Sequence, residues 1–315
     1  MRKELVMMSS PHVVIIVLNW NRKDDTLACL ESLRQVTYPD FETVVVDNGS
    51  TDGSVPAIRA RFPGQPVIET GENLGFAEGN NVGLRYARER GADYALLLNN
   101  DVEVAPDFLT RLIEVIDADP SIGVVGPMIY YFDLPDTIWS AGGHIDWARG
   151  RSSMIGVDER HNERSHITRE VDFVSGCALL VRMSALEKAG DLDSRFFMYY
   201  EETEWCVRIR RAGYRIMHVP QAKIWHKIKP NARADSPLAH YYMTRNRLLF
   251  LKATGAGVRS WLYTLLCEYL RTLLSWTLRP KWRGKKPQRR MMLRAIEDAL
   301  QGRWGQLSTS QVSKG

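Results

Sequence analysis

Residues 13–18 (VVIIVL) decide the fold, because six consecutive apolar residues, five of them β-branched, are followed at once by the polar residue Asn19. A continuous apolar run of this length is typical of a strand that is buried on both faces of a parallel sheet. Two later stretches end in the same way, 41–46 (FETVVV) and 94–98 (YALLL). We therefore expect three buried parallel strands, with a short additional strand at 67–69.

Segments with helical spacing separate these strands. In 24–35 (DDTLACLESLRQ) leucines recur every three residues, behind aspartates that are suited to a helix N-terminus. Further helices are expected at 54–62, 80–90 and 106–118, the last beginning with proline. The alternation of strands and helices predicts an α/β fold with a doubly wound, mostly parallel sheet.

Polar clusters follow three of the expected strands: NWN at 19–21, DNGS at 47–50 and NND at 99–101. Ligands of doubly wound sheets bind beyond the carboxyl ends of the strands, so the three clusters point to one binding crevice. The alternative for any single cluster is an ordinary turn, since Asn, Asp and Gly all favour turns. Three clusters at one edge of the sheet favour the crevice.

The middle of the chain has weaker patterns. Residues 133–170 are expected to be irregular. The segments expected to be ordered after them are strands at 171–173 and 178–181, a helix at 184–189, a helix at 204–212 that ends at Gly213, and strands at 214–219 and 222–226.

Composition narrows the class of protein. Of 315 residues, 25% are charged and 10% are aromatic, which excludes a disordered chain, a collagen-like fibre and a disulfide scaffold. The four cysteines form no CxxC pair, so a zinc ribbon or a thioredoxin-type site is not expected. The first residues (MRKELVMMSSPH) lack the apolar core of a signal peptide, which favours a cytoplasmic protein.

The C-terminal part of the chain is strongly basic. Residues 252–315 hold 13 of the 42 Lys and Arg residues but 3 of the 37 Asp and Glu residues. Residues 261–278 are mostly apolar but are interrupted by Glu268 and Arg271, and 279–290 follow with seven Lys and Arg. An amphipathic helix on an anionic membrane surface fits this pattern better than a membrane span. The alternative is a core helix followed by a solvated loop. No recognised nucleic-acid-binding motif accompanies the basic residues.

Two carboxylates at the strand ends are candidates for binding a metal ion and a nucleoside. Asp101 suits a hard divalent cation that carries a diphosphate. Asp47, at the neighbouring strand end, could accept a hydrogen bond from a nucleobase N–H or a ribose hydroxyl. Each aspartate alone is also compatible with a turn.

Three further acids, Glu201, Glu202 and Glu204, lie within four residues. Like charges this close raise one another's pKa, which suits a general base. The alternative is the solvated first turn of a helix, where the helix dipole favours acids. Arg245 and Asn246, on a later helical stretch, could bind phosphate, although arginine is also common on helices.

Eight motifs in order give the chain a resemblance to a known family. They are VVIIVLNWN (13–21), VVVDNGSTDGS (44–54), ENLGFAEGNNVGL (72–84), LLLNNDVEV (96–104), FVSGCALLVR (173–182), FFMYYEETEWCVRIRRAGYRI (196–216), IWHK (224–227) and YYMTRNRLLF (241–250). Together they resemble the inverting GT-A glycosyltransferases of family 2, close to the rhamnosyltransferase-like branch. This resemblance implies a GT-A domain at 1–250, with a nucleotide-binding half at 11–130 and an acceptor-binding half at 131–250. A helical, basic extension at 251–315 would follow.

The resemblance also implies roles for individual residues. Asp101 matches the acid that holds Mg²⁺ or Mn²⁺ on the diphosphate, and His226 matches a histidine that supplies a further metal contact in some relatives. Glu202 stands at the position of the general base, with Glu201 and Glu204 as alternatives. The residues implied in nucleotide binding are Asn19, Asn21, Asp47, Asn73, Gly75, Phe76, Asn80, Asn99 and Asn100. Those implied near the acceptor or donor sugar are Trp139, Gly176 and Trp205.

The implied reaction is a single displacement that inverts the anomeric carbon of a sugar. The donor would be a dTDP-, UDP- or GDP-linked sugar, and the branch favours rhamnose. The acceptor would be a glycan or a polyprenyl-linked sugar at the inner face of the cell membrane, as in cell-wall or O-antigen assembly. One alternative is a nucleotidyltransferase, but its Gly-rich basic loop is missing after the first strand. Another is a non-catalytic nucleotide-sugar-binding or membrane scaffold protein, which would not need Asp101 or the acids at 201–204.

Overall fold

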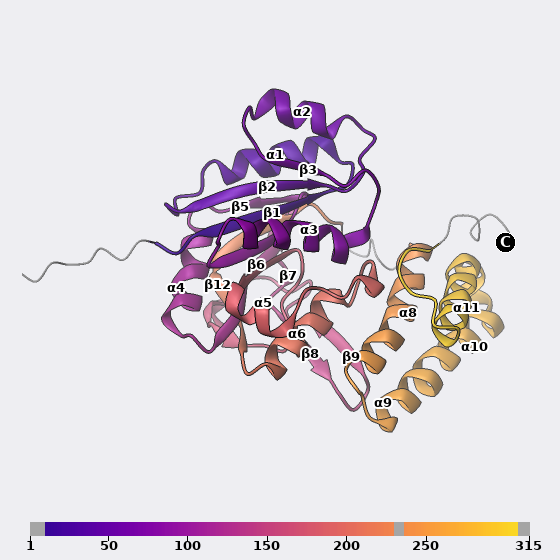
Figure 1. The fold of residues 1–315 in the computed structure, drawn as a ribbon. Helices are drawn as coiled ribbons and strands as arrows, with labels where there is room; N and C mark the ends of the chain where they lie inside the picture. The colour runs from indigo at the N-terminus through magenta and orange to yellow at the C-terminus, as the bar shows by residue number, and fades with distance from the viewer. Residues whose placement is uncertain (1–9, 230–235, 308–315) are drawn as a thin grey trace, which may run out of the picture.

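The computed structural model describes residues 10–229 and 236–307, and it contains one large sheet with helices on both faces (Figure 1). The expectation for the N-terminal residues lies mostly outside the described residues. The strands are β1 (Val13–Asn19), β2 (Phe41–Asp47), β3 (Val67–Glu69), β4 (Tyr94–Asn99), β5 (Val102–Val104), β6 (Ile122–Tyr131), β7 (Leu134–Ser140), β8 (Gly143–Asp146), β9 (Arg151–Met154), β10 (Arg169–Glu170), β11 (Ala178–Arg182) and β12 (Arg215–His226).

Helices connect these strands and complete the C-terminal part. They are α1 (Lys23–Leu33), α2 (Ser54–Arg61), α3 (Gly75–Glu89), α4 (Phe108–Ala118), α5 (Met183–Ala189), α6 (Glu201–Arg211), α8 (Pro237–Ala253), α9 (Val258–Leu262), α10 (Arg271–Leu278) and α11 (Lys286–Leu300). Single-turn or irregular helices are η1 (Glu163–His166), η2 (Ser194–Phe196), η3 (Tyr263–Leu270) and η4 (Pro280–Lys285).

The sheet confirms the expected mostly parallel architecture. Its strand order is β10-β12-β6-β11-β4-β1-β2-β3, with β5 and β7 paired at its margins. The first four strands run parallel, and their register aligns Asn19 with Asp47 and Leu18 with Asn99. The three polar clusters therefore do meet at one edge of the sheet. Strand β11 lies antiparallel between β4 and β6, which makes the sheet mixed.

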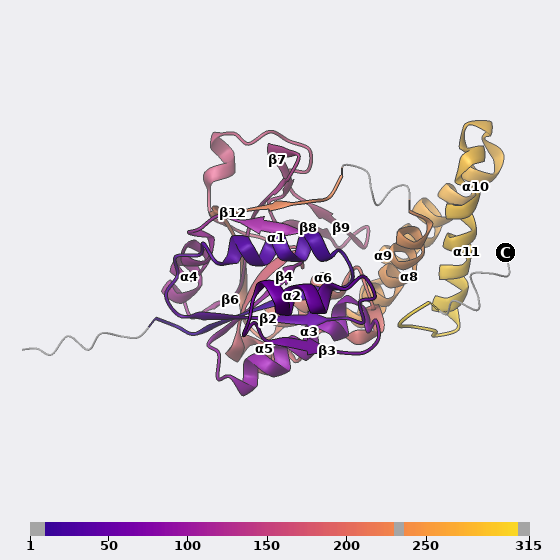
Figure 2. The ribbon, with the colours of Figure 1, turned by 90° about the horizontal axis from the view of Figure 1, so that it is seen from above.

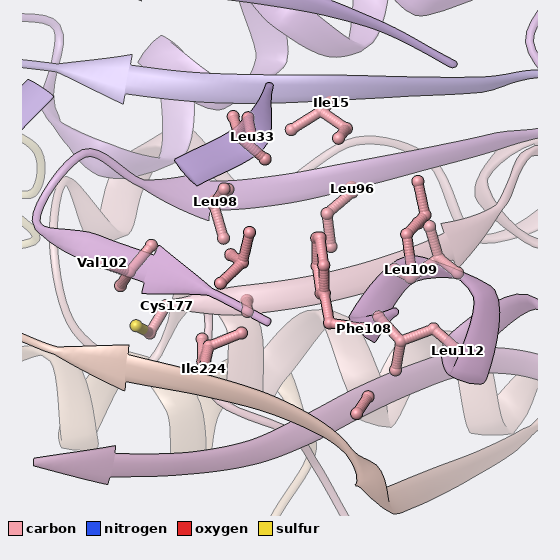
Figure 3. Close-up of a cluster of buried hydrophobic side chains, with 14 of the residues drawn as sticks. Ile15, Leu33, Leu96, Leu98, Val102, Phe108, Leu109, Leu112, Cys177 and Ile224 are labelled. Carbon is pink, nitrogen blue, oxygen red and sulfur yellow. The ribbon is translucent and has the colours of Figure 1, made fainter. Parts of the chain in front are cut away.

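Apolar residues from both faces of the sheet form the core. On one face α1, α2 and α4 cover the strands, and Figure 3 shows Leu33, Phe108 and Leu109 gathered with Ile15 and Leu96 in this layer. On the other face lie α3, α5 and α6, together with part of α8. Because the strands are covered on both sides, their residues are apolar without alternation, as the sequence indicates.

The last four α-helices stand beside the sheet, as Figures 1 and 2 both show at the right of the view. Helix α8 runs across residue 250, where the sequence suggested a boundary, and packs against α11. Helices α9, η3 and α10 follow one another without a break, and η3 has π-type hydrogen bonding. Arg247, which is 6% exposed, forms an ion pair with Glu268 and donates to Gly150 O, so this part is tied to the body.

The C-terminal helices carry a row of exposed leucines. Leucines recur every fourth residue along α9, η3 and α10, and each is at least 47% exposed: Leu262, Leu266, Leu270, Leu274 and Leu278. Within the described residues, no helix combines the length and the apolar character that a crossing of the bilayer requires.

Several expected segments were wrong in extent. Strand β6 was not expected, and 133–170 contains β7, β8 and β9 instead of irregular chain. Residues 171–173 form no strand, since Phe173 makes only an isolated bridge to Gly143. The two strands expected between 214 and 226 are one strand, β12, with an irregular register after Val219.

Two helices begin earlier than expected. Helix α3 begins at Gly75, so Gly75, Phe76 and Asn80 lie in its first turns. Helix α6 begins at Glu201, so the acids form its first turn. The expected end of that helix is confirmed, because Gly213 follows it with a φ of 94°.

Candidate active site

Side-chain amides tie the ends of β1, β2 and β4 together. Asn19 Nδ2 donates to Asp47 Oδ2 (2.6 Å) and to Ser50 Oγ (3.0 Å), and its Oδ1 accepts from Thr26 Oγ1 (2.7 Å) and Asn100 Nδ2 (3.0 Å). These bonds use both donors and both acceptor positions of the amide. Asn19 is 0% exposed, so its side chain holds the crevice edge together instead of facing a nucleotide, which corrects one expectation.

A second polar network connects β2 with the start of α3. Asn48 Nδ2 donates to Gly75 O (3.0 Å) and to Asn73 Oδ1 (3.1 Å), and Asn48 Oδ1 accepts from Leu74 N. Asn73 Oδ1 also accepts from Gly75 N, the first residue of α3. The implied nucleotide residues Asn73 and Gly75 are thereby fixed next to the end of β2, where Asp47 lies.

Asn21 and Asn80 occupy different positions around this edge. Asn21 has a left-handed backbone (φ 59°), and its Oδ1 accepts from Thr51 N, so it ties the loop between β1 and α1 to the loop after β2. Asn80 is buried; its Nδ2 donates to Phe76 O (2.9 Å), and its Oδ1 has no hydrogen-bond partner among the described residues. A buried acceptor oxygen without a partner is uncommon, and a donor on a bound ligand would satisfy it.

Asp101 lies just beyond β4, between two cationic or basic groups. Its Oδ1 is 3.0 Å from His226 Nε2, and its Oδ2 is 3.2 Å from Arg22 Nη1. Burial raises the pKa of Asp101, but His226 and Arg22 outweigh this effect and hold the pKa below its usual range. Trp139, expected near a sugar, instead packs edge-on against the His226 ring at 4.7 Å and is 6% exposed.

The pair of Asp101 and His226 fits one divalent cation that also takes substrate oxygens. Mg²⁺ is commonly held by one or two protein side chains together with phosphate oxygens and waters. In the part of the chain that the structure describes, no set of three or more His, Cys, Asp and Glu side chains gathers around one point. The remaining ligands would therefore come from the diphosphate and water.

The three acids at the start of α6 have distinct surroundings. Glu204 is buried and accepts two hydrogen bonds from Arg208 (2.8 and 2.9 Å). Burial raises the pKa of Glu204, and Arg208 offsets part of this effect. Glu201 is also buried. Glu202 is half-buried and borders a cavity of about 130 Å³ whose other walls include Ser152, Ser153 and Tyr199.

Gly176 is the point where the acids meet the nucleotide side of the crevice. A Cβ atom at this position would lie 2.9 Å from the Phe76 ring and 3.5 Å from Glu202 Cβ. The next residue, Cys177, accepts a hydrogen bond at its carbonyl from Asn99 N (2.9 Å). The loop before β11 therefore lies between the Asn99–Asp101 strand end and Glu202, and a side chain larger than hydrogen at Gly176 would close this junction.

Three implied site residues lie elsewhere. The Trp205 ring is 0% exposed and its Nε1 donates to Gly190 O, so it belongs to the core and not to a sugar site. Arg245 and Asn246 are 1% and 0% exposed, and both donate to backbone carbonyls of the turn before α6. Both side chains therefore use their donors inside the protein, which leaves the expected phosphate contact without support from their surroundings.

Sequence reasoning missed four residues of the site: Arg22, Thr26, Asn48 and Ser50. Asn48 and Ser50 lie inside a cluster that the sequence singled out, so their proximity to Asp47 was a usable signal. Thr26 and Arg22 gave none, because their contacts depend on how α1 leaves β1 through two consecutive left-handed residues, Asn21 and Arg22.

Comparison with known proteins identifies the family. The family model described as "Glycosyl transferase family 2" matches residues 14–190. The chain is 28% identical over 272 residues to the N-acetylglucosaminyl-diphospho-decaprenol L-rhamnosyltransferase of Mycobacterium tuberculosis, covering 79% of this chain and 83% of that protein. It is 27% identical over 254 residues to the dTDP-rhamnosyl transferase RfbF of Shigella flexneri, covering 78% and 81%.

Among solved structures, the fold is similar to that of a mannosyltransferase from Pyrobaculum calidifontis in complex with GDP-Man and Mn²⁺. The TM-score is 0.59 at 17% identity, and the match covers 92% of this chain and 87% of that one. The architecture is therefore that of the GT-A glycosyltransferases. Since the family model matches more than half of the chain, the protein is a glycosyltransferase and belongs to glycosyl transferase family 2.

Proposed function

We propose that this enzyme transfers a sugar from a nucleoside-diphosphate donor to a hydroxyl of a glycan or lipid-linked acceptor, with inversion of the anomeric carbon. The sugar that we propose is rhamnose. The observation that carries the proposal is the junction at Gly176, where the nucleotide-side residue Phe76 and the acid Glu202 are brought within contact of one glycine. The similarity to two rhamnosyltransferases supports the choice of sugar.

The proposed donor site lies along the ends of β2 and β4. Asp47 and the unpartnered Asn80 Oδ1 would accept hydrogen bonds from the nucleoside. Asp101 and His226 would hold Mg²⁺ or Mn²⁺. Such an ion, when bound, supplies positive charge that stabilises the leaving diphosphate. Arg22, at 3.2 Å from Asp101, would lie near the same charge.

Glu202 is the proposed general base, because it alone of the three acids borders the described cavity while Glu204 is paired with Arg208. The Glu202 carboxylate takes the proton of the acceptor hydroxyl while the acceptor oxygen forms a bond to the anomeric carbon. The bond from that carbon to the diphosphate breaks, and the nucleoside diphosphate leaves with the electron pair. Attack from the face opposite the leaving group inverts the anomeric centre.

A release assay tests this proposal. The purified enzyme with Mn²⁺ or Mg²⁺ is given dTDP-rhamnose, UDP-sugars or GDP-sugars, with and without membrane lipid extract, and free nucleoside diphosphate is measured. We expect release from one donor, at least 100-fold lower in Asp101→Asn and Glu202→Gln and abolished by EDTA. Asp107→Asn, which removes a surface charge at the residue before α4 that pairs only with Arg111 among the described residues, is the matched control and keeps full activity. Release that persists in Asp101→Asn or after EDTA would reject the metal site.

The stereochemistry has its own readout. NMR of the product should give the anomeric configuration opposite to that of the donor. Retention of configuration would contradict a single displacement from Glu202. Saturable donor binding without turnover, even with lipid extract, would instead favour a non-catalytic nucleotide-sugar-binding protein.

We further propose that the C-terminal helices bind an anionic membrane surface, which would place the enzyme at the inner face of the cell membrane. The exposed leucine row on α9, η3 and α10 is followed directly by the seven Lys and Arg of 279–290. An apolar edge beside clustered positive charge fits the interface of an anionic bilayer.

Sedimentation with vesicles tests the membrane proposal. Binding should be at least tenfold stronger to vesicles that contain phosphatidylglycerol than to pure phosphatidylcholine, and Leu270→Glu should abolish it. Leu300→Glu is the matched control, because Leu300 is 82% exposed but lies on α11, outside the row. Equal binding to both vesicle types, or an equal loss in both variants, would contradict the proposal.

A further inference from the structure

The turn that leads into the acids has an unusual backbone. Phe197, Tyr199 and Tyr200 have φ values of 63°, 70° and 75°, and Glu201 follows directly. Residues with a Cβ atom rarely occupy this left-handed region, and a bulky residue there is an outlier. Three such residues within four positions persist only where the surrounding structure holds them in place.

Asn246 of α8 is the main contact that holds this turn. Its Nδ2 lies 2.6 Å from Phe196 O, 2.7 Å from Met198 O and 3.0 Å from Tyr199 O, and the residue is 0% exposed. One buried amide group, with two N–H donors, thus lies within hydrogen-bond distance of three carbonyls of the turn. Donors at this position are needed because buried carbonyl groups without partners are costly.

Neighbouring contacts connect the turn to the end of the described chain. Arg245 donates to Phe196 O (3.4 Å) and to Gly305 O (2.7 Å), and Gly305 N donates to Arg195 O (2.8 Å). Arg245 also lies over the Tyr241 and Tyr242 rings. The RN pair at 245–246 therefore binds the turn from the side of the C-terminal helices.

The opposite side of the turn contacts the nucleotide side of the crevice. Phe197 O accepts from Phe76 N at 2.6 Å, and a Cβ at Gly75 would lie 2.6 Å from the same oxygen. The turn is therefore held between α3, which borders the donor site, and α8. Its conformation sets where Glu201 and Glu202 begin α6.

We propose that Asn246 is a positioning residue for the general base: it holds the left-handed turn 196–200 so that Glu202 faces the junction at Gly176. This inference rests on the proposed role of Glu202 as base. It assigns to Asn246 an effect on the chemical step and none on donor binding, since Asn246 is buried behind the turn, donates only to backbone carbonyls and accepts from the neighbouring Arg245 side chain.

The test compares Asn246→Ala with Asn81→Ala. Asn81 is a matched control because it is 4% exposed and its amide also bonds backbone, at Leu192, away from the acids. With dTDP-rhamnose as donor and release of dTDP as readout, we expect kcat of Asn246→Ala to fall at least tenfold while KM for the donor stays within twofold. The pKa of the general base, as read from the pH profile of kcat, should also shift. Asn81→Ala should keep kcat and the profile.

A rescue variant separates positioning from general damage. Glycine adopts positive φ without support, so Tyr199→Gly should make kcat insensitive to Asn246→Ala, when the double variant is compared with Tyr199→Gly alone. Three results would overturn the proposal: equal kcat in Asn246→Ala and Asn81→Ala, a tenfold rise in donor KM at unchanged kcat, or no rescue. The second result would restore a diphosphate contact.

Hydrogen exchange provides a readout that does not depend on turnover. Amides of 197–204 should exchange at least tenfold faster in Asn246→Ala than in wild type. In Asn81→Ala their exchange rates should equal those of the wild type. If the wild-type enzyme released no nucleotide from any donor, the proposed function would fail, whereas exchange would still decide whether Asn246 holds the turn. Unchanged exchange in Asn246→Ala would reject the positioning role itself.

Discussion

A glycine pair offers a quantitative test of how tightly the turn at 196–200 is held. Gly75 and Gly53 have nearly the same φ, 81° and 80°. A Cβ at Gly53 has nothing within 4 Å, whereas a Cβ at Gly75 would meet Phe197 O at 2.6 Å. That oxygen cannot retreat easily, because Phe76 N binds it at 2.6 Å.

The two alanine variants therefore separate two costs. Gly53→Ala carries the left-handed conformation alone, which costs about 1–2 kcal/mol for a residue with a Cβ. Gly75→Ala carries the same cost and an overpacking cost of roughly 1–3 kcal/mol. We expect urea unfolding to give about 2–5 kcal/mol of destabilisation for Gly75→Ala, and kcat to fall because Phe197 is displaced.

The assay is the unfolding midpoint by circular dichroism, with the slope checked in both variants. Equal destabilisation by the two substitutions would refute the reasoning, since it would mean that the Phe197 carbonyl yields without cost. A loss of stability in Gly75→Ala without any loss of kcat would refute only the link to the acids.

Three further predictions concern groups away from the crevice. Burial and Arg169 lower the pKa of His218 to about 3, below its unfolded value, so at pH 5 the unfolded state binds a proton that the folded state does not. The free energy of unfolding should therefore fall by about 2 kcal/mol from pH 7 to pH 5, and in His218→Phe this loss should be smaller by that amount, as measured by urea unfolding at both pH values. Trp205→Phe removes the hydrogen bond to Gly190 O and should cost about 1 kcal/mol with kcat within twofold; a tenfold lower kcat would restore a sugar contact. Glu268→Ala leaves the Arg247 guanidinium buried without its carboxylate and should lower stability by about 3 kcal/mol in thermal unfolding, whereas a neutral effect would show that Arg247 relaxes to solvent.

The parts of the fold that the sequence predicts are those with a simple periodicity. Strands β1, β2 and β4 are buried on both faces, so their apolar runs are continuous and end where polar clusters begin. Strand β6 was not predicted, because Gly123, Gly126 and Pro127 interrupt its apolar sequence. In the structure Gly126 lies against Val174 and Gly123 against Tyr214, so these glycines permit close packing and do not mark turns.

The polar residues at the strand ends predicted where the candidate site lies. They did not predict what each side chain does there. Asn19 and Asn246 are polar residues within the motifs, yet the side chains of both form their hydrogen bonds with other residues of the protein. A sequence cannot tell whether the partner of an amide is a ligand or a distant carbonyl, because that depends on residues nearly 50 positions away. Trp205 presents the same difficulty with its indole N–H.

The π-type segment η3 has a consequence for the leucine row. In an α-helix of about 3.6 residues per turn, a four-residue repeat advances about 40° beyond a full turn at every step. Over the four steps from Leu262 to Leu278 such a repeat would wind most of the way to the opposite side of the helix. A π-type turn contains more residues, so the same repeat falls short of a full turn there.

The wider turns of η3 span the first half of the row and α10 spans the second, so the two deviations have opposite sign and largely cancel. The leucines thereby stay in phase along one straight edge of the helix. The π-type turns of η3 therefore keep the exposed leucines on one edge of the helix, whereas the same four-residue repeat in a uniform α-helix would spread them around it.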